Sequence, residues 1–200
     1  FAQYVETPLR PLPDWRIPAT IITDYDTTAG DATLFTKSGA WTRLTTVFGY
    51  SGRVYTSTAT GQNSVTYSAR VSSTAWYDVY AYIVGGSFRT TRAPYDIYDS
   101  AGVRRVLVDQ SNTNTLGWQL LGKAFLNSDS LRPIVRLSND SIGTGLGVNT
   151  GGIMLILNRK LSPNASTTSV QFEITEPPSE FVVSNAYPNP FNPETVIGYW

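Results

Sequence analysis

The sequence predicts an all-β chain, in which a single β-sandwich of the jelly-roll type lies between two extended proline-rich arms. After residue 20, no stretch of ten residues places apolar side chains at i, i+3, i+4 and i+7, as an amphipathic helix requires. Short runs rich in β-branched and aromatic residues instead recur at intervals of about ten residues. Clusters of Gly, Asn, Asp and Ser separate these runs and favour turns.

Nine runs are the expected strands, in chain order residues 54–58, 64–71, 76–84, 95–98, 105–109, 118–125, 134–137, 152–157 and 169–174. The second and the last alternate apolar and polar residues, which is typical of strands with one buried face. The third is rich in aromatic residues, and the eighth is almost entirely aliphatic, as in strands that are fully buried. Eight or nine short strands are typical of a sandwich or jelly roll.

The flanking segments are rich in proline. Residues 1–20 contain four prolines and are expected to form an extended arm. We place the sandwich at 21–158 and a polar linker with one added strand at 159–185. A second proline-dense segment occupies 186–200. Because the chain opens on Phe without a signal segment, we expect a processed mature chain or an excised fragment.

The composition excludes several classes of function. Fifteen Lys and Arg residues balance fifteen Asp and Glu residues, so the charge does not favour nucleic acid or an anionic membrane as partner. The chain has no Cys and no His, which removes thiol nucleophiles, Cys/His zinc sites and the commonest general base. The longest apolar run is far shorter than the roughly 18 residues that span a bilayer, so no membrane insertion is expected.

We expect no catalysis and no cofactor. Paired carboxylates can carry out acid-base chemistry without histidine. However, four of the five Glu residues fall in the flanking segments, and the Asp residues fall mostly at turns.

The third expected strand carries a candidate binding surface. Its alternation places Trp76, Tyr80 and Tyr82 on one face, and aromatic faces suit the stacking of sugar rings. The alternative, which the sequence favours, is a central strand buried on both faces. Trp41 and Trp118 are expected in the core.

Three acidic residues near the start of the body, Asp24, Asp26 and Asp31, offer oxygen ligands of the kind that Ca²⁺ prefers. Their spacing does not match an EF-hand loop, and Asp is a common turn residue. Turns therefore explain these residues better, and no metal is expected.

A series of ordered blocks stands at residues 39–41 (GAW), 49–55 (GYSGRVY), 77–82 (YDVYAY), 92–97 (RAPYDI), 106–110 (VLVDQ), 118–122 (WQLLG) and 135–139 (VRLSN). In this order they resemble the golvesin C-terminal-like domain, a secreted β-sandwich module that also accompanies bacterial polysaccharide lyases such as xanthan lyase. The resemblance implies a sandwich from about Asp24 to Leu157. Around residues 148–152 the family's closing Ala-Asp-Ala segment is replaced, so the role of that Asp is not carried over.

The stretch 186–199 (AYPNPFNPETVIGY) is similar to the opening of the C-terminal sorting domains read by the type IX secretion system. This resemblance implies export to the cell surface or the medium by a Bacteroidetes-like bacterium. The family's domain continues for further strands, whereas this sequence stops at Trp200.

Four Asp-Ser or Asp-Thr triplets resemble the acceptor for O-glycosylation of exported Bacteroidetes proteins, with the hydroxyls of Thr27, Ser100, Ser130 and Ser141 as acceptors. All four lie in expected loops, where a glycan fits. Ordinary turn chemistry predicts the same residues, so both interpretations stay open.

The sequence favours a structural function, that of an extracellular subunit whose partner is itself, in a filament, sheath or surface layer. Extended arms become ordered by docking on a surface, and they can pack on, or add a strand to, a neighbouring subunit. The arm residues available for this are Phe1, Tyr4, Val5, Leu9, Leu12, Trp15, Ile17, Phe181, Val183, Tyr187, Phe191, Val196 and Ile197.

The alternative is a carbohydrate-binding accessory module of a secreted polysaccharide-degrading enzyme. Its partner would be a polysaccharide, for example at the cell surface, bound by Trp76, Tyr80 or Tyr82.

Overall fold

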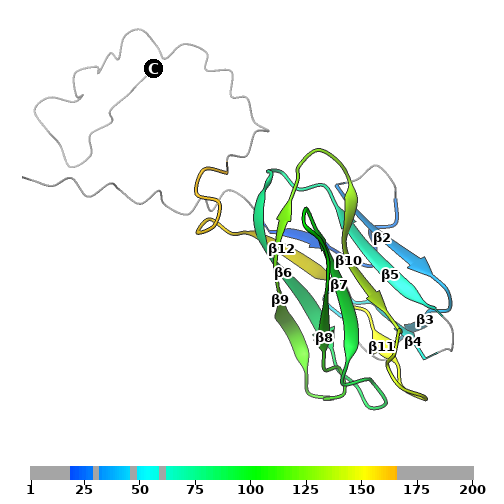
Figure 1. The fold of residues 1–200 in the computed structure, drawn as a ribbon. Coiled ribbons are helices and arrows are strands. Elements are labelled where there is room, and N and C mark those ends of the chain that lie inside the picture. The colour runs from blue at the N-terminus through cyan, green and yellow to red at the C-terminus, as the bar shows by residue number, and fades with distance from the viewer. Residues whose placement is uncertain (1–18, 29–31, 46–48, 59–61, 166–200) are drawn as a thin grey trace, which may run out of the picture. The chain divides into compact units, whose positions relative to one another are not determined.

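The computed structural model describes residues 19–28, 32–45, 49–58 and 62–165 (Figure 1), and every structural statement below concerns these residues. They form twelve strands. They contain no helix of the length and hydrophobicity needed to cross a bilayer. Residues 1–18 of the first expected arm, the expected strand at 169–174 and the second arm at 186–200 lie outside the described residues, whereas Thr20, expected in the first arm, begins the first strand.

The strands are β1 Thr20–Ile22, β2 Thr33–Ser38, β3 Thr42–Leu44, β4 Val54–Ser57, β5 Ser64–Ala69, β6 Ala75–Val84, β7 Ala93–Asp99, β8 Gly102–Val108, β9 Leu116–Leu126, β10 Arg132–Ser138, β11 Val148–Asn149 and β12 Ile153–Leu157.

Two antiparallel sheets form the sandwich (Figure 1), one in the order β1-β12-β6-β9 and the other in the order β2-β5-β10-β7-β8. Apart from the edge strand β2, each sheet has four strands. Along these eight strands, the chain crosses between the two sheets at every connection except that from β7 to β8. Two interlocked four-stranded sheets in this order are the arrangement of a jelly roll. The expected all-β sandwich is therefore confirmed. A third sheet, β11-β4-β3, has only three short strands.

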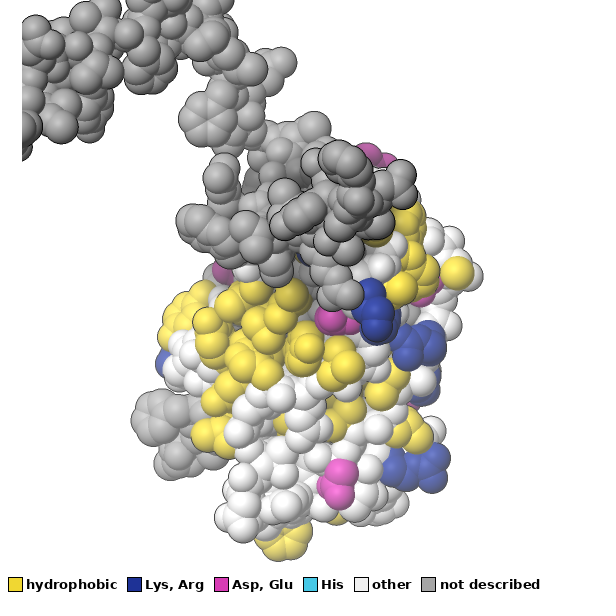
Figure 2. All heavy atoms as spheres, turned by 90° about the vertical axis from the view of Figure 1, so that its left-hand side faces the viewer, with side chains coloured by type: hydrophobic (Ala, Val, Ile, Leu, Met, Phe, Trp, Pro, Cys, Tyr) yellow, Lys and Arg dark blue, Asp and Glu magenta, His cyan; other side chains and the backbone are white. Residues whose placement is uncertain are grey.

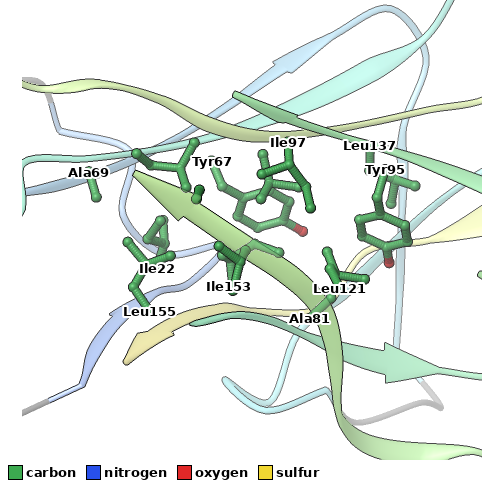
Figure 3. Packing of buried hydrophobic residues seen from close by; sticks show 14 of the residues in the cluster. Ile22, Tyr67, Ala69, Ala81, Tyr95, Ile97, Leu121, Leu137, Ile153 and Leu155 are labelled. Atoms are coloured by element: carbon green, nitrogen blue, oxygen red, sulfur yellow. The ribbon is translucent and has the colours of Figure 1, made fainter. Parts of the chain in front are cut away.

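The core fills the space between the two large sheets. Figure 3 shows Tyr67, Ile97 and Leu137 of one sheet pointing towards Ile153 and Leu155 of the other. All five side chains are buried. Each buried aliphatic side chain contributes about 1.5–3 kcal/mol to folding, so this layer supplies much of the driving force.

The expected strands and the observed ones differ mainly at the start of the described chain. The strands β1, β2 and β3 precede the first expected strand, which corresponds to β4. In β2, only Phe35 is buried, because this strand lies at the edge of its sheet. A single buried residue gives little apolar pattern, which explains why the sequence does not reveal this strand.

Candidate functional site

The outer face of the β1-β12-β6-β9 sheet carries the aromatic residues singled out in the sequence. Along β6, every second residue from Ala75 to Ile83 is buried in the core, and the residues between them are half-buried. Trp76, Tyr80 and Tyr82 therefore share the face that points away from the core. The expectation that this strand is buried on both faces is wrong, since the second sheet covers only one of them.

Neighbouring strands extend this apolar face. Across the strand pairs, Tyr80 lies opposite both Leu120 of β9 and Met154 of β12. Leu120 is 54% exposed and Ile156 is 39% exposed. Figure 2, which views the molecule from the side of β6, β9 and β12, shows hydrophobic side chains gathered over this sheet. Apolar patches of this kind often mark binding surfaces.

Three aromatic rings meet at one end of this face, and we call Tyr50, Tyr82 and Trp118 the aromatic platform. The ring centroids of Tyr50 and Trp118 are 5.0 Å apart, and those of Tyr82 and Trp118 are 5.2 Å apart at an interplanar angle of 80°. Tyr50 and Tyr82 are 5.8 Å apart. These separations are those of directly interacting rings, so each ring restrains the other two.

Of the three candidate stacking residues named from the sequence, only Tyr82 belongs to the platform. Tyr80 lies two residues away on the same face, about 6.6 Å along the strand. Trp76 lies about 20 Å from Tyr82 at strand geometry, where its ring packs edge-on against Phe125 at a centroid distance of 5.7 Å.

Two platform residues were missed by sequence reasoning. Trp118 was expected in the core, but it lies half-buried opposite Tyr82 on the outer face. Tyr50, which is 46% exposed, comes from the loop before β4. Trp41, also expected in the core, is half-buried and packs against the core. The pairing of β6 with β9 creates the platform, and no local pattern in either strand indicates that pairing.

Gly152, the residue before β12, makes room for the platform. A Cβ at Gly152 would lie 3.2 Å from Trp118 and 3.8 Å from Tyr50, so a side chain here would press on both rings. The carbonyl of Gly152 also accepts a hydrogen bond of 2.8 Å from the Tyr82 amide, which fixes the backbone below the Tyr82 ring.

The loop that carries Tyr50 is held to a buried carboxylate. Ser51, next to Tyr50, donates its hydroxyl hydrogen bond to Oδ1 of Asp24. The other oxygen of Asp24 is buried and has no hydrogen-bond partner among the described residues. Burial raises the pKa of the Asp24 carboxyl above its ordinary value, although the Ser51 hydroxyl and the nearby charge of Arg53 act in the opposite direction.

This environment predicts a pH-dependent cost in stability. A carboxyl whose pKa is raised in the folded state binds its proton more tightly there than in the unfolded chain. Below pH 3.8, the ordinary value, Asp24 is protonated in both states and carries no penalty. As the pH rises through the folded pKa, the buried carboxylate loses its proton and the free energy of unfolding falls.

We therefore expect Asp24→Asn to stabilise the protein by about 1 kcal/mol at pH 7 and to have little effect at pH 3, because the amide removes the buried charge. Thermal melts of both proteins across this pH range measure the difference. Asp99→Asn, at the half-buried end of β7, serves as the control and should show no such trend. A difference in melting temperature between Asp24→Asn and wild type that is the same at every pH contradicts this account.

The three calcium candidates do not come together as one set of ligands in the described chain. Asp24 accepts from Ser51, and Asp26 accepts a hydrogen bond of 2.6 Å from the amide of Thr23. Asp31 lies outside the described residues. Within the described residues, no group of three or more acidic, His or Cys side chains is placed to hold a metal ion.

The four candidate glycosylation residues, Thr27, Ser100, Ser130 and Ser141, are all exposed. Exposure is necessary for modification but does not distinguish it from turn chemistry. Asp99, which precedes Ser100, accepts a hydrogen bond of 2.7 Å from the amide of Ala101, as a turn residue does. Glycosylation stays a prediction.

Comparison with known proteins gives the family. Residues 24–156 match the golvesin C-terminal domain. The chain belongs to this family. A solved structure of a Paenibacillus xanthan lyase is similar to the golvesin domain described here, with a TM-score of 0.60 and 26% sequence identity. The match covers 70% of this chain but only 13% of the xanthan lyase chain. No curated protein sequence matches.

Proposed function

We propose that this golvesin domain is a non-catalytic, extracellular accessory module that binds polysaccharide through its aromatic platform and serves a polysaccharide-degrading enzyme. The geometry of Tyr50, Tyr82 and Trp118 is the observation that carries the proposal, because partly exposed rings gathered on the outer face of a sheet suit the apolar faces of sugar rings. The likeness to part of a xanthan lyase supports the enzyme context.

The strand framework makes the platform a rigid surface. Tyr82 and Trp118 stand on paired strands, and the register around them is continuous from Tyr80 to Val84. A surface that is ordered before binding loses little conformational entropy when a sugar docks. The golvesin family membership and the likeness to a xanthan lyase structure are why we place the module outside the cell.

The experiment is affinity gel electrophoresis in the presence of xanthan, the first polysaccharide to test because the similar structure is a xanthan lyase. We expect Trp118→Ala to weaken binding about tenfold or more, the effect of losing about 1.4 kcal/mol of stacking. Tyr82→Ala should have a similar effect. Trp76→Ala, at the far end of the same face, is the matched control and should change binding less than twofold.

If no polysaccharide in a panel that includes xanthan retards the protein, the proposal is wrong. Binding that is lost in Trp76→Ala but kept in Trp118→Ala would move the site to the other end of the face. The melting temperature of each variant shows whether a loss of binding reflects a loss of fold.

Self-assembly through the two arms stays a separate prediction. The arm residues lie outside the described residues, and so does the segment similar to a sorting-domain opening. Export through type IX secretion and origin in a Bacteroidetes-like bacterium likewise rest on the sequence resemblance alone. Negative-stain electron microscopy of the full chain, with and without residues 1–18, tests assembly directly, because only the full chain should form filaments.

A further inference from the structure

The connection between β6 and β7 contains an exposed aromatic residue in an unusual backbone conformation. The side chain of Phe88 is 76% exposed, the highest value among the large hydrophobic residues of the described chain. Its φ angle is 60°, in the left-handed region that bulky side chains rarely adopt. No burial compensates for this conformation, and uncompensated strain of this kind tends to mark functional positions.

The next residue, Arg89, is a half-buried cation that has no carboxylate partner within the described part of the chain. The ion pairs of arginines in the described residues involve Arg105, Arg132 and Arg136 but not Arg89. Burial lowers the pKa of the Arg89 guanidinium from its ordinary value. A guanidinium that gives up part of its hydration usually recovers the cost by pairing with an anion.

The guanidinium is nevertheless fixed in place. Its Nε donates a hydrogen bond of 2.6 Å to Oδ1 of Asn149, and Nη1 lies 3.4 Å from the carbonyl oxygen of Phe88. Arginine has five N–H donors, so most of them remain available to a ligand. These free donors lie on the planar fork that binds a carboxylate through two parallel hydrogen bonds.

Asn149 is itself held by a buried network. Its side-chain amide donates to the carbonyl of Val84 at 3.0 Å. Its backbone amide donates to Oε1 of Gln110 at 2.8 Å, and its carbonyl accepts from Nε2 of Gln110 at 2.9 Å. The orientation of Arg89 is therefore set by residues that are almost completely buried. Such support is typical of a built binding site.

Backbone hydrogen bonds join three loops at this position. The amide of Thr90 donates to the carbonyl of Gly147 at 3.0 Å, and the amide of Gly147 donates to the carbonyl of Phe88 at 3.0 Å. Gln110 donates to the carbonyl of Thr90 at 2.9 Å. A Cβ at Gly147 would lie 2.7 Å from Cγ2 of Thr58, 3.1 Å from the carbonyl oxygen of Ser57 and 3.3 Å from Nη1 of Arg89, so a side chain here would crowd the β4 end and the guanidinium alike.

We propose that Phe88 and Arg89 form a subsite for a carboxylate-bearing sugar residue, whose ring packs on Phe88 and whose carboxylate binds the guanidinium of Arg89. This inference rests on the proposed function and adds the chemical class of the ligand. The subsite lies near the end of β6 that carries Tyr82, since the strand ends at Val84. Because an exposed aromatic residue directly precedes the arginine in the chain, we favour an acidic sugar over a simple anion, which needs no ring.

The test is isothermal titration calorimetry of the full chain with oligogalacturonate, oligoglucuronate and oligomannuronate, each compared with its methyl ester. The ester removes the negative charge and leaves the sugar ring unchanged. We expect at least one acidic oligomer to bind tenfold or more tightly than its ester, and Arg89→Gln to reduce its affinity to that of the ester. Arg92→Gln, an exposed arginine three residues further on, should leave the preference unchanged.

Phe88→Gly is a second variant that should not disturb folding, because glycine adopts this φ angle readily and the side chain is exposed. We expect this variant to bind the acidic oligomer and its ester about fivefold more weakly than wild type does, as loss of ring packing predicts. Thermal melts of the variants confirm that each is folded.

Three results overturn the inference: acids and esters that bind equally, an acid preference that survives Arg89→Gln in a folded protein, or no binding of any acidic oligomer. The xanthan binding assay distinguishes each of these results from failure of the proposed function. If Trp118→Ala abolishes xanthan binding while acids and esters bind alike, the platform stands and this subsite does not. If Trp118→Ala leaves all binding intact but Arg89→Gln removes the acid preference, the subsite stands and the platform does not.

Discussion

Replacing Gln110 by leucine is expected to lower the free energy of unfolding by about 3 kcal/mol, since it leaves three buried polar groups without partners. Gln110 is completely buried. It donates to the hydroxyl of Tyr95 at 3.0 Å and to the carbonyl of Asn149 at 2.9 Å, and it accepts from the amide of Asn149 at 2.8 Å. Leucine has a similar volume, so the loss comes from hydrogen bonds and not from a cavity.

Chemical denaturation in urea measures this loss as a lower midpoint at an unchanged slope. Gln119→Leu, at an exposed position of β9, is the matched control and should change the free energy of unfolding by less than about 0.5 kcal/mol. If Gln110→Leu is as stable as the control, the network around Asn149 does not stabilise the fold. It would then also be a poor support for Arg89.

The fold class can be predicted from the sequence because a sandwich strand with one buried face alternates apolar and polar residues along its own length. In β5, Val65, Tyr67 and Ala69 alternate with polar residues, and all three are buried in the core. The alternation of β6 likewise identifies which residues share a face. One buried face per strand is enough to recognise a two-layered β fold, without knowledge of which strands are neighbours.

The candidate site does not follow in the same way, since it depends on neighbours that are far apart in the chain. Tyr50, Tyr82 and Trp118 belong to a loop and two strands whose pairing is a global property of the jelly roll. The Phe88 and Arg89 pair has no sequence pattern either. Its significance comes from a φ angle and from a missing ion-pair partner, and neither can be read from residue types.

A single methyl group at Gly151 is expected to affect both stability and binding. The Cβ of Gly151→Ala would lie 1.9 Å from the carbonyl oxygen of Tyr82. The carbonyl belongs to the backbone and the position of a Cβ is fixed by its own backbone, so no rotation of a side chain relieves the contact, and β6 must move away from the segment that leads into β12. We expect a loss of about 3 kcal/mol or more in the free energy of unfolding. Xanthan binding should fall as well, because Tyr82 moves with its backbone.

The adjacent glycine separates these two effects. A Cβ at Gly152 points to the outer face and meets Trp118 at 3.2 Å, where a ring can shift by a few tenths of an ångström. We expect Gly152→Ala to cost less than about 1 kcal/mol in stability, because only side chains must adjust, yet to weaken xanthan binding by disturbing the platform. Urea denaturation and affinity electrophoresis on both variants provide the comparison. If Gly152→Ala binds xanthan as tightly as wild type, the exact arrangement of the three rings is not what the polysaccharide recognises.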